Sequence, residues 1–215
     1  MKRTFIPLLV TGLLVAAPAF AQVELIPRFS WIDTDAHEDI EGDPDANRLR
    51  MELEDETGFG VAVNFYLGSR VSAEVGLSLV QPDVIITETN DQSGAFVNTF
   101  DTEVIPVTAV LQYHFNPDGP FDFYIGGGVA YVLVDNVEGD SVDDASFDSI
   151  ELDEDAGFAA NIGFNFWFSD SFGLNVDAKY VPLESSANVV FGSGETATDI
   201  SINPLILSGG LSLRF

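Results

Sequence analysis

Apolar side chains recur at every second position along most of the chain beyond residue 21, which is the period of a β-strand and not of a helix. Residues 205–215 show the pattern most clearly, because their odd positions are mainly Leu and Phe while their even positions include Ser and Arg. Such a segment has one apolar and one polar face. The pattern occurs eight times and predicts strands over residues 23–31, 59–67, 71–79, 105–115, 121–133, 158–168, 174–180 and 205–215.

The start of the chain is organised differently. Lys2 and Arg3 precede an apolar run over residues 5–20, and the run closes with an A-x-A sequence. This is the layout of a secretory signal peptide, and the run is shorter than the roughly 20 residues that a spanning helix needs. We therefore expect residues 1–21 to be a cleaved signal peptide and residues 22–215 to form one exported domain.

Eight strands of about ten residues in an exported chain match the length and the alternation of a transmembrane β-barrel. A soluble sandwich or a lipocalin-like barrel shares this alternation, but the distribution of side chains favours the membrane barrel. Charged side chains occur only on the face rich in Gly and Asn, whereas the other face carries too many Phe residues to fit inside a small barrel. The sequence therefore predicts an all-β fold, an eight-stranded antiparallel transmembrane β-barrel.

The connections between the predicted strands alternate between short and long. The short ones lie at residues 68–70, 116–120 and 169–171, and the long ones lie near 34–55, 83–102, 135–155 and 185–198. Outer-membrane barrels alternate short periplasmic turns with long extracellular loops in the same way. An even number of strands would also place both ends of the barrel domain on the periplasmic side.

Charge and composition exclude several classes of function. The chain has 35 acidic against 8 basic residues and a formal net charge of -27, which argues against nucleic-acid binding through phosphate neutralisation. It has no Cys, which excludes disulfide scaffolds, thiol nucleophiles and thiolate metal sites. No segment beyond the signal peptide approaches 18 consecutive apolar residues, which argues against a helical membrane protein.

The acidic residues are concentrated in and directly beside the predicted long loops, because residues 33–56, 83–103, 135–155 and 184–199 hold 29 of the 35. The favoured interpretation is a solvated, self-repelling outer surface. A second interpretation is that loop carboxylates bind a divalent cation, because Ca²⁺ and Mg²⁺ prefer oxygen ligands. The candidate ligands are Asp33, Asp35, Glu38, Asp39, Glu41, Asp43 and Asp45. Their spacing lacks the D-x-D-x-D-G pattern of a defined calcium site, so this indication is weak.

The polar face of the strands predicts a charged interior. The interior of an eight-stranded barrel is just wide enough for side chains or one small ligand, so a general aqueous porin is not expected. The predicted polar core consists of Glu24, Arg28, Glu74, Gln112, His114, Asp177, Lys179 and Arg214. Buried charges persist when they are paired, so we expect these residues to pair and to close the periplasmic half of the barrel.

Catalysis is not indicated. His37 and His114 are the only histidines, and the predicted topology places them at opposite ends of the barrel. The chain lacks a G-x-S-x-G element, and we interpret His114 as a hydrogen-bonding residue of the interior. We expect no catalytic residue and no cofactor.

Six motifs carry a resemblance to a known family: ETGFG at 56–60, LQYHF at 111–115, YIGGGVAY at 124–131, GFAANIGFNFWF at 157–168, LNVDAKYVPLES at 174–185 and DISINPLILSGGLSLRF at 199–215. Through them the chain resembles the outer-membrane protein W (OmpW) family of eight-stranded barrels. Their order spans essentially the whole mature chain. The long acidic first and third loops depart from the family pattern.

The resemblance implies an outer-membrane location in a Gram-negative bacterium and a narrow apolar channel for small hydrophobic molecules that opens sideways into the lipid. It implies contact with outer-membrane lipid and lipopolysaccharide, and recognition by the barrel insertion machinery through Leu213 and Phe215. The alternative is a sealed structural barrel whose acidic loops contact ions, lipopolysaccharide or external partners.

Four prolines suggest where a sideways opening would lie. Pro82 ends one predicted strand and Pro106 begins the next, and Pro182 and Pro204 do the same for another neighbouring pair. Proline cannot donate to the strand ladder, so each could leave a local break in a barrel wall. We expect Pro82 with Pro106 to frame the opening; the alternative is that all four prolines only end strands.

Overall fold

The structure is a computed structural model that describes residues 22–33, 37–40, 48–53, 55–90, 94–138, 147–152, 155–191 and 194–215. The predicted signal peptide lies outside these ranges. Within them the chain forms fourteen strands, and we find no helix there of the length and hydropathy needed to cross a membrane.

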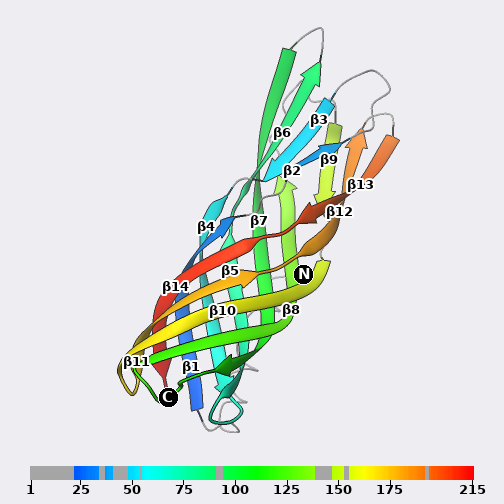
Figure 1. The fold of residues 1–215 in the computed structure, drawn as a ribbon. Helices are drawn as coiled ribbons and strands as arrows, with labels where there is room; N and C mark the ends of the chain where they lie inside the picture. The colour runs from blue at the N-terminus through cyan, green and yellow to red at the C-terminus, as the bar shows by residue number, and fades with distance from the viewer. Residues whose placement is uncertain are drawn as a thin grey trace.

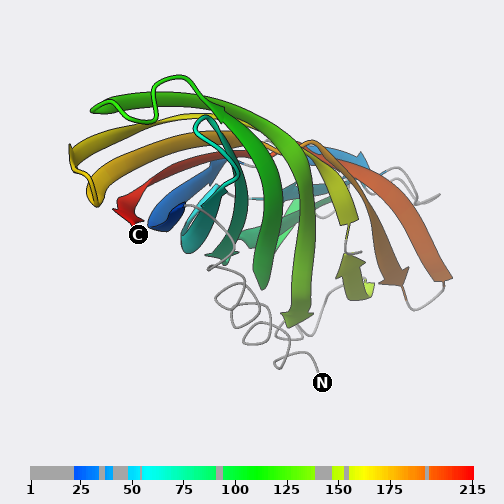
Figure 2. The same cartoon turned by 90° about the horizontal axis from the view of Figure 1, so that it is seen from below.

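Eight of the strands close into an antiparallel barrel (Figures 1 and 2), which confirms the predicted fold class. They are β1 (Gln22–Asp33), β4 (Glu56–Tyr66), β5 (Val71–Val80), β7 (Gly94–His114), β8 (Phe121–Glu138), β10 (Asp155–Ser169), β11 (Phe172–Tyr180) and β14 (Leu205–Arg214). Each pairs with the next in this order, and β14 returns to pair with β1. All eight overlap the strands predicted from the alternation, but β7 begins at Gly94 and not at 105, and β8 runs to Glu138 and not to 133.

The other six strands extend the barrel walls beyond its upper end in Figure 1. They are β2 (His37–Ile40), β3 (Arg48–Leu53), β6 (Asp83–Asn90), β9 (Phe147–Leu152), β12 (Leu183–Phe191) and β13 (Gly194–Ile202). One extension has the order β2-β3-β6-β7 and the other β13-β12-β9. The prediction of eight strands was therefore incomplete, because these six segments fall in regions that are rich in acidic and polar residues and were assigned to long loops.

The three short connections lie together at the opposite end of the barrel. They comprise residues 67–70, 115–120 and 170–171, as the sequence predicted. Backbone hydrogen bonds close them: Leu67 N–H donates to Val71 O at 2.9 Å, and Gly119 N–H donates to Asn116 O at 3.0 Å. This end is called the turn end below.

The barrel is apolar outside and polar inside. Phe59 on β4 and Val129 on β8 point outward and are 70% and 60% exposed, whereas Glu24 and Glu74 point inward and are at most 1% exposed. A water-soluble protein hides its large apolar side chains and exposes its carboxylates. The inverse arrangement is typical of a barrel whose outer wall contacts lipid.

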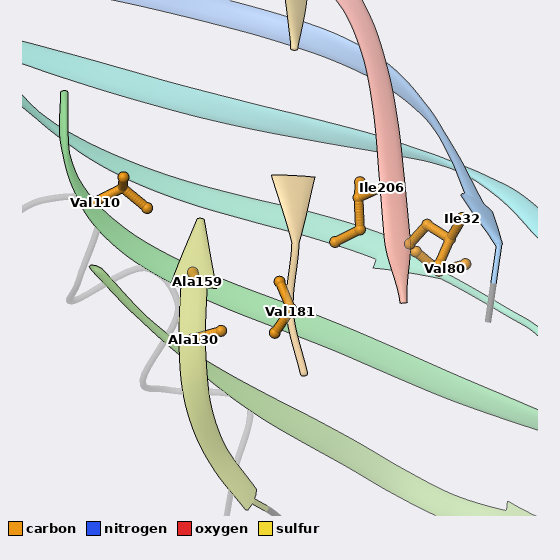
Figure 3. Packing of buried hydrophobic residues seen from close by; sticks show 7 residues of the cluster. All are labelled: Ile32, Val80, Val110, Ala130, Ala159, Val181 and Ile206. Carbon is orange, nitrogen blue, oxygen red and sulfur yellow. The ribbon is translucent and has the colours of Figure 1, made fainter. Parts of the chain in front are cut away.

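The interior changes character along the barrel axis. Towards the extensions it holds a cluster of small and branched apolar side chains (Figure 3), called the apolar layer below. Its members are Ile32, Val80, Val110, Ala130, Ala159, Val181 and Ile206. None of them is more than 6% exposed, so the layer is packed closed. Along β5 the charged Glu74 lies nearer the turn end than Val80 of this layer, whereas Val110 of the layer pairs with Glu74 in the ladder.

Candidate functional site

Glu74 on β5 is the centre of the charged interior. Arg28 on β1 donates two hydrogen bonds to its carboxylate, at 3.2 and 2.7 Å. Lys179 on β11 donates a third at 2.8 Å and Gln112 on β7 a fourth at 3.0 Å. Bidentate and charge-assisted hydrogen bonds are the strong kind, and they compensate the cost of burying three charges. Four strands are thereby tied together across the interior.

A second carboxylate, Asp177 on β11, lies beside this centre. Its Oδ2 accepts hydrogen bonds from Tyr124 Oη at 3.0 Å and from Asn161 Nδ2 at 2.8 Å. Lys179 Nζ lies 3.9 Å from Oδ1, which is too long for a hydrogen bond. Asn175 in turn donates to Tyr124 Oη at 2.9 Å. Hydrogen bonds between side chains thus join β8, β10 and β11 on this side of the interior.

Nearer the turn end, Glu24 and Arg214 join β1 to β14 with aromatic support. Tyr66 Oη donates to Glu24 at 2.9 Å, and Arg214 Nη2 lies 3.9 Å from the same carboxylate. The Arg214 guanidinium stacks 3.7 Å from the Trp167 ring centroid and 5.4 Å from that of Tyr66. Cation–π contact of this kind favours a cation that has lost its water.

His114 brings together a serine and an aspartate. Its Nδ1 is 2.6 Å from Asp122 Oδ2 and its Nε2 is 3.0 Å from Ser72 Oγ, which is the connectivity of a Ser–His–Asp triad. All three residues are completely buried, and Ser72 Oγ also donates to Gln112 Oε1 at 3.2 Å. No substrate carbonyl can approach the hydroxyl, so the arrangement serves as a hydrogen-bond chain in this conformation.

The structure brings the eight residues of the predicted polar core into one interior network, seven of them buried and Arg214 partly buried. Asp122 and Ser72 were not singled out from the sequence. Their signal was available, because Asp122 shares its face with Tyr124 and Ser72 shares its face with Glu74 in the period-two pattern. His37 lies in β2, and nothing is described of its side chain.

The strand ladder is interrupted at one of the two predicted proline pairs. Opposite Pro106, Ser78 and Leu79 have no ladder partner on β7, and pairing resumes at Val80. We call this interruption the wall gap. Pro106 lies inside β7 and not at the start of a strand, which corrects the prediction, because β7 continues into the extension. Pro82 ends β5 as predicted and leads into β6, which pairs with the same strand β7.

The second pair shows no such interruption. Pairing of β11 with β14 is continuous up to Tyr180 and Leu205, and Val181 N–H then donates to Pro204 O at 3.1 Å. Pro182 and Pro204 therefore only mark the points where the barrel strands pass into the extension. Of the two proline pairs, only the one that contains Pro106 remains a candidate for a sideways opening.

A small cavity lies on the inner side of the wall gap. Its lining includes Pro106 and Ser78 at the gap together with Arg28, Asp177 and Lys179 of the charged interior. It has room for about one water molecule. The cavity therefore places the polar side chains of Arg28, Asp177 and Lys179 on the interior side of the wall gap.

Comparison with known proteins now identifies the architecture. The OmpW family model matches residues 27–215. The chain belongs to the OmpW family. Outer membrane protein W of Vibrio cholerae is 27% identical over 219 residues, which cover 98% of this chain and 99% of that protein.

Two solved structures of outer-membrane proteins share the fold. OprG from Pseudomonas aeruginosa aligns with a TM-score of 0.73 at 18% identity, over 90% of this chain and 95% of that one. AlkL in lipid bilayers aligns with a TM-score of 0.62 at 20% identity, over 90% of each chain. As an OmpW family barrel, the protein lies in the outer membrane of a Gram-negative bacterium, and its exposed apolar wall contacts lipid. The turn end is accordingly periplasmic.

Two further predictions concern residues near the ends of this OmpW family barrel. Phe215 is 78% exposed and its N–H donates to Val23 O at 2.9 Å, which leaves its ring outside the periplasmic end. Recognition of Phe215 and Leu213 by insertion machinery stays a prediction.

Of the weak metal candidates, Asp33 ends β1 and Asp39 lies in β2, while Asp35, Asp43 and Asp45 fall outside the described residues. The described part of the chain contains no group of three potential metal ligands.

Proposed function

We propose that this barrel admits small apolar molecules from the outside and releases them sideways into the outer membrane at the wall gap beside Pro106. The observation that carries the proposal is the order of residues along β5: Val80 of the apolar layer towards the outside, then Leu79 and Ser78 at the wall gap, and then Glu74 of the charged network nearer the turn end. The proposal agrees with the function that the family resemblance implies.

The charged network opposes passage straight through to the periplasm. Arg28, Glu74 and Lys179 hold one another across the full width of the interior. An apolar molecule gains nothing by displacing these hydrogen bonds, because it would leave buried charges unpaired. The axial route is therefore unfavourable to the solutes that the apolar layer would accept.

The apolar layer supports entry from the outside. Its side chains pack closed, but they make only dispersion contacts, which an apolar solute can replace. Ala130 and Ala159 are also small, so modest shifts of Val80 or Val181 would open space for a narrow molecule. We infer that the layer opens when a solute binds.

The wall gap supports a sideways exit. Neighbouring barrel strands are held by a continuous ladder, and here two residues of β5 lack ladder partners on β7. Proline removes the N–H that would close the ladder, so the two strands can separate locally at little cost in hydrogen bonds. Leu79 and Val107, on the outer side of the gap, would meet the emerging solute.

The test measures entry of a labelled small apolar compound into vesicles that carry the refolded barrel and have lipopolysaccharide in the outer leaflet. Pro106→Ala restores the missing N–H, and we expect it to slow entry towards the rate of a sealed eight-stranded barrel. Pro204→Ala is the matched control, since the pairing there already continues, and entry should be unchanged. Equal rates for Pro106→Ala and the unaltered barrel would reject the sideways exit.

A second candidate is a sealed structural barrel whose acidic loops contact ions, lipopolysaccharide or external partners. The close packing of the apolar layer favours it. Entry no faster than through the sealed barrel, across several apolar compounds, would establish this alternative.

A further inference from the structure

The cavity behind the wall gap is lined by two side chains with unused hydrogen-bonding atoms. Arg28 uses both terminal nitrogens on Glu74, and its Nε has no hydrogen-bond partner among the described residues. Asp177 uses Oδ2 for Tyr124 and Asn161, and its Oδ1 likewise has no hydrogen-bond partner in the described part of the chain. Arg28 is 7% exposed and Asp177 is 1% exposed.

Buried polar atoms are nearly always satisfied, so each of these two atoms calls for a hydrogen-bond partner in the cavity that the described residues do not supply. The guanidinium Nε–H can only donate, and the carboxylate oxygen can only accept. One group that accepts from Arg28 and donates to Asp177 would satisfy both. A hydroxyl does this, whereas a carbonyl satisfies only Arg28 and an alkyl group satisfies neither.

The charges around the cavity disfavour an ionic ligand. Arg28 and Lys179 are balanced by Glu74 and Asp177, so the four formal charges sum to zero. An anion would meet the Asp177 carboxylate, and a cation would meet Arg28 and Lys179, which already donate hydrogen bonds to Glu74. A small neutral group is the chemistry that this cavity fits.

The cavity also adjoins the apolar layer. Ile206 lines the cavity and belongs to the layer, so a ligand whose polar atom occupies the cavity can lay an apolar chain along the layer. Ser78, Thr108 and Ser208 add neutral hydroxyls to the rim. Polar and apolar parts of one molecule would each find a matching surface.

We propose that the barrel binds amphiphiles with a single hydroxyl head, such as straight-chain primary alcohols, with the hydroxyl in the cavity beside Pro106 and the chain against the apolar layer. This inference rests on the proposed function and names the solute class that the site prefers. The hydroxyl accepts from Arg28 Nε and donates to Asp177 Oδ1.

Two glycines supply a matched pair of variants. Gly76 lines the cavity, and a Cβ at this position would lie 2.8 Å from Thr108 Oγ1 and 3.7 Å from Lys179 Nζ, so Gly76→Ala places a methyl group in the cavity. Gly209 is on the outer face of β14, where an added Cβ meets no heavy atom within 4 Å. Gly209→Ala therefore adds the same methyl group outside the site.

The experiment titrates 1-octanol, octanal and octane separately into the barrel in lipid nanodiscs and follows the amide NMR signals of Ser78 and Ser208. We expect 1-octanol to bind about tenfold more tightly than octane, with octanal between them, because each satisfied charged group adds a hydrogen bond. Gly76→Ala should abolish the preference for 1-octanol and Gly209→Ala should retain it.

Equal affinities for the three probes on the unaltered barrel would overturn the inference, and this comparison decides even if Gly76→Ala fails to fold. A preference for 1-octanol that survives in Gly76→Ala would also overturn it. Failure here is distinct from failure of the proposed function: octane entry that depends on Pro106, without any preference for 1-octanol, would retain the sideways exit and reject only the hydroxyl site.

Discussion

Arg28 on β1 and Glu74 on β5 form a bidentate ion pair, at 3.2 and 2.7 Å, across the inner face of the strand that separates them. Hydrogen bonds of the ladder join only neighbouring strands, so this pair adds a constraint that the ladder cannot supply. It draws together two strands that flank β4 and so supports the tight curvature of a small barrel. Lys179, from the opposite wall, completes the constraint.

Glu74→Gln should destabilise the folded barrel by about 3 kcal/mol, because it leaves Arg28 and Lys179 with one uncompensated buried positive charge. Urea-induced unfolding in lipid vesicles measures the change. The double variant Glu74→Gln with Lys179→Met restores neutrality and should be more stable than Glu74→Gln alone. A double variant that is less stable than either single change would contradict this account of the pairing.

Asp122→Asn should loosen the periplasmic turn and weaken the hydrogen bond at His114 Nδ1. The Asp122 carboxylate accepts from Asn116 N–H at 3.2 Å and can only accept from His114 Nδ1. We expect a loss of about 2 kcal/mol and a shifted ¹⁵N signal of Nδ1, because an amide oxygen is a weaker acceptor than a carboxylate. Asp118→Asn, on the exposed part of the same turn, is the control. An unchanged Nδ1 signal in Asp122→Asn would show that Asp122 does not bind the ring.

The size of side chains in the apolar layer should set the rate of solute entry. Val80→Ala removes two buried methyl groups and should speed entry of an apolar compound while costing about 2 kcal/mol of stability. Ala159→Leu should slow entry, since it fills the layer. Val129→Ala, on the outer wall, should change neither quantity much. Identical entry rates for Val80→Ala and Ala159→Leu would show that the layer is not on the route.

Ser72 should not react with a fluorophosphonate, in spite of its alignment with His114 and Asp122. The hydroxyl is completely buried and already hydrogen-bonded, and a phosphorus centre needs an open approach. Mass spectrometry of the treated, refolded barrel measures the outcome. A mass increase localised to Ser72 would mean that the periplasmic end opens further than the structure indicates.

The sequence predicted the barrel strands well, since lipid contact demands an apolar side chain at every second position of each. It did not predict β3, where Arg48, Arg50 and Glu52 alternate with Leu and Met in a segment that is rich in charge and lies beyond the barrel. The alternation of apolar and polar residues predicts which face of a strand a side chain lies on, but not which side chains of other strands it contacts. The contacts of Glu74 with Arg28 and Lys179 depend on how the strands are staggered around the barrel. A local sequence pattern contains no information on this stagger.

The wall gap illustrates the same limit. The sequence shows that Pro106 lacks an N–H. Only the strand register shows that this interrupts the pairing of β7 with β5, opposite Ser78, and not the pairing of β7 with β8. The cavity behind the gap was also beyond prediction, because its lining comes from residues as distant in sequence as Arg28 and Ser208. The interior position of Asp122 could have been predicted, because the alternation places this residue on the inner face of its strand.

The seam between β1 and β14 constrains the order of assembly. Ser30 and Ser208, 178 residues apart, meet across it at 2.8 Å, so the cylinder is completed by its earliest and latest strands. Until β14 is available, β1 keeps one unpaired edge, and no intermediate on the way to the native state can be a closed cylinder. The native cylinder can therefore close only after β14 has been synthesised and exported, by pairing along this seam.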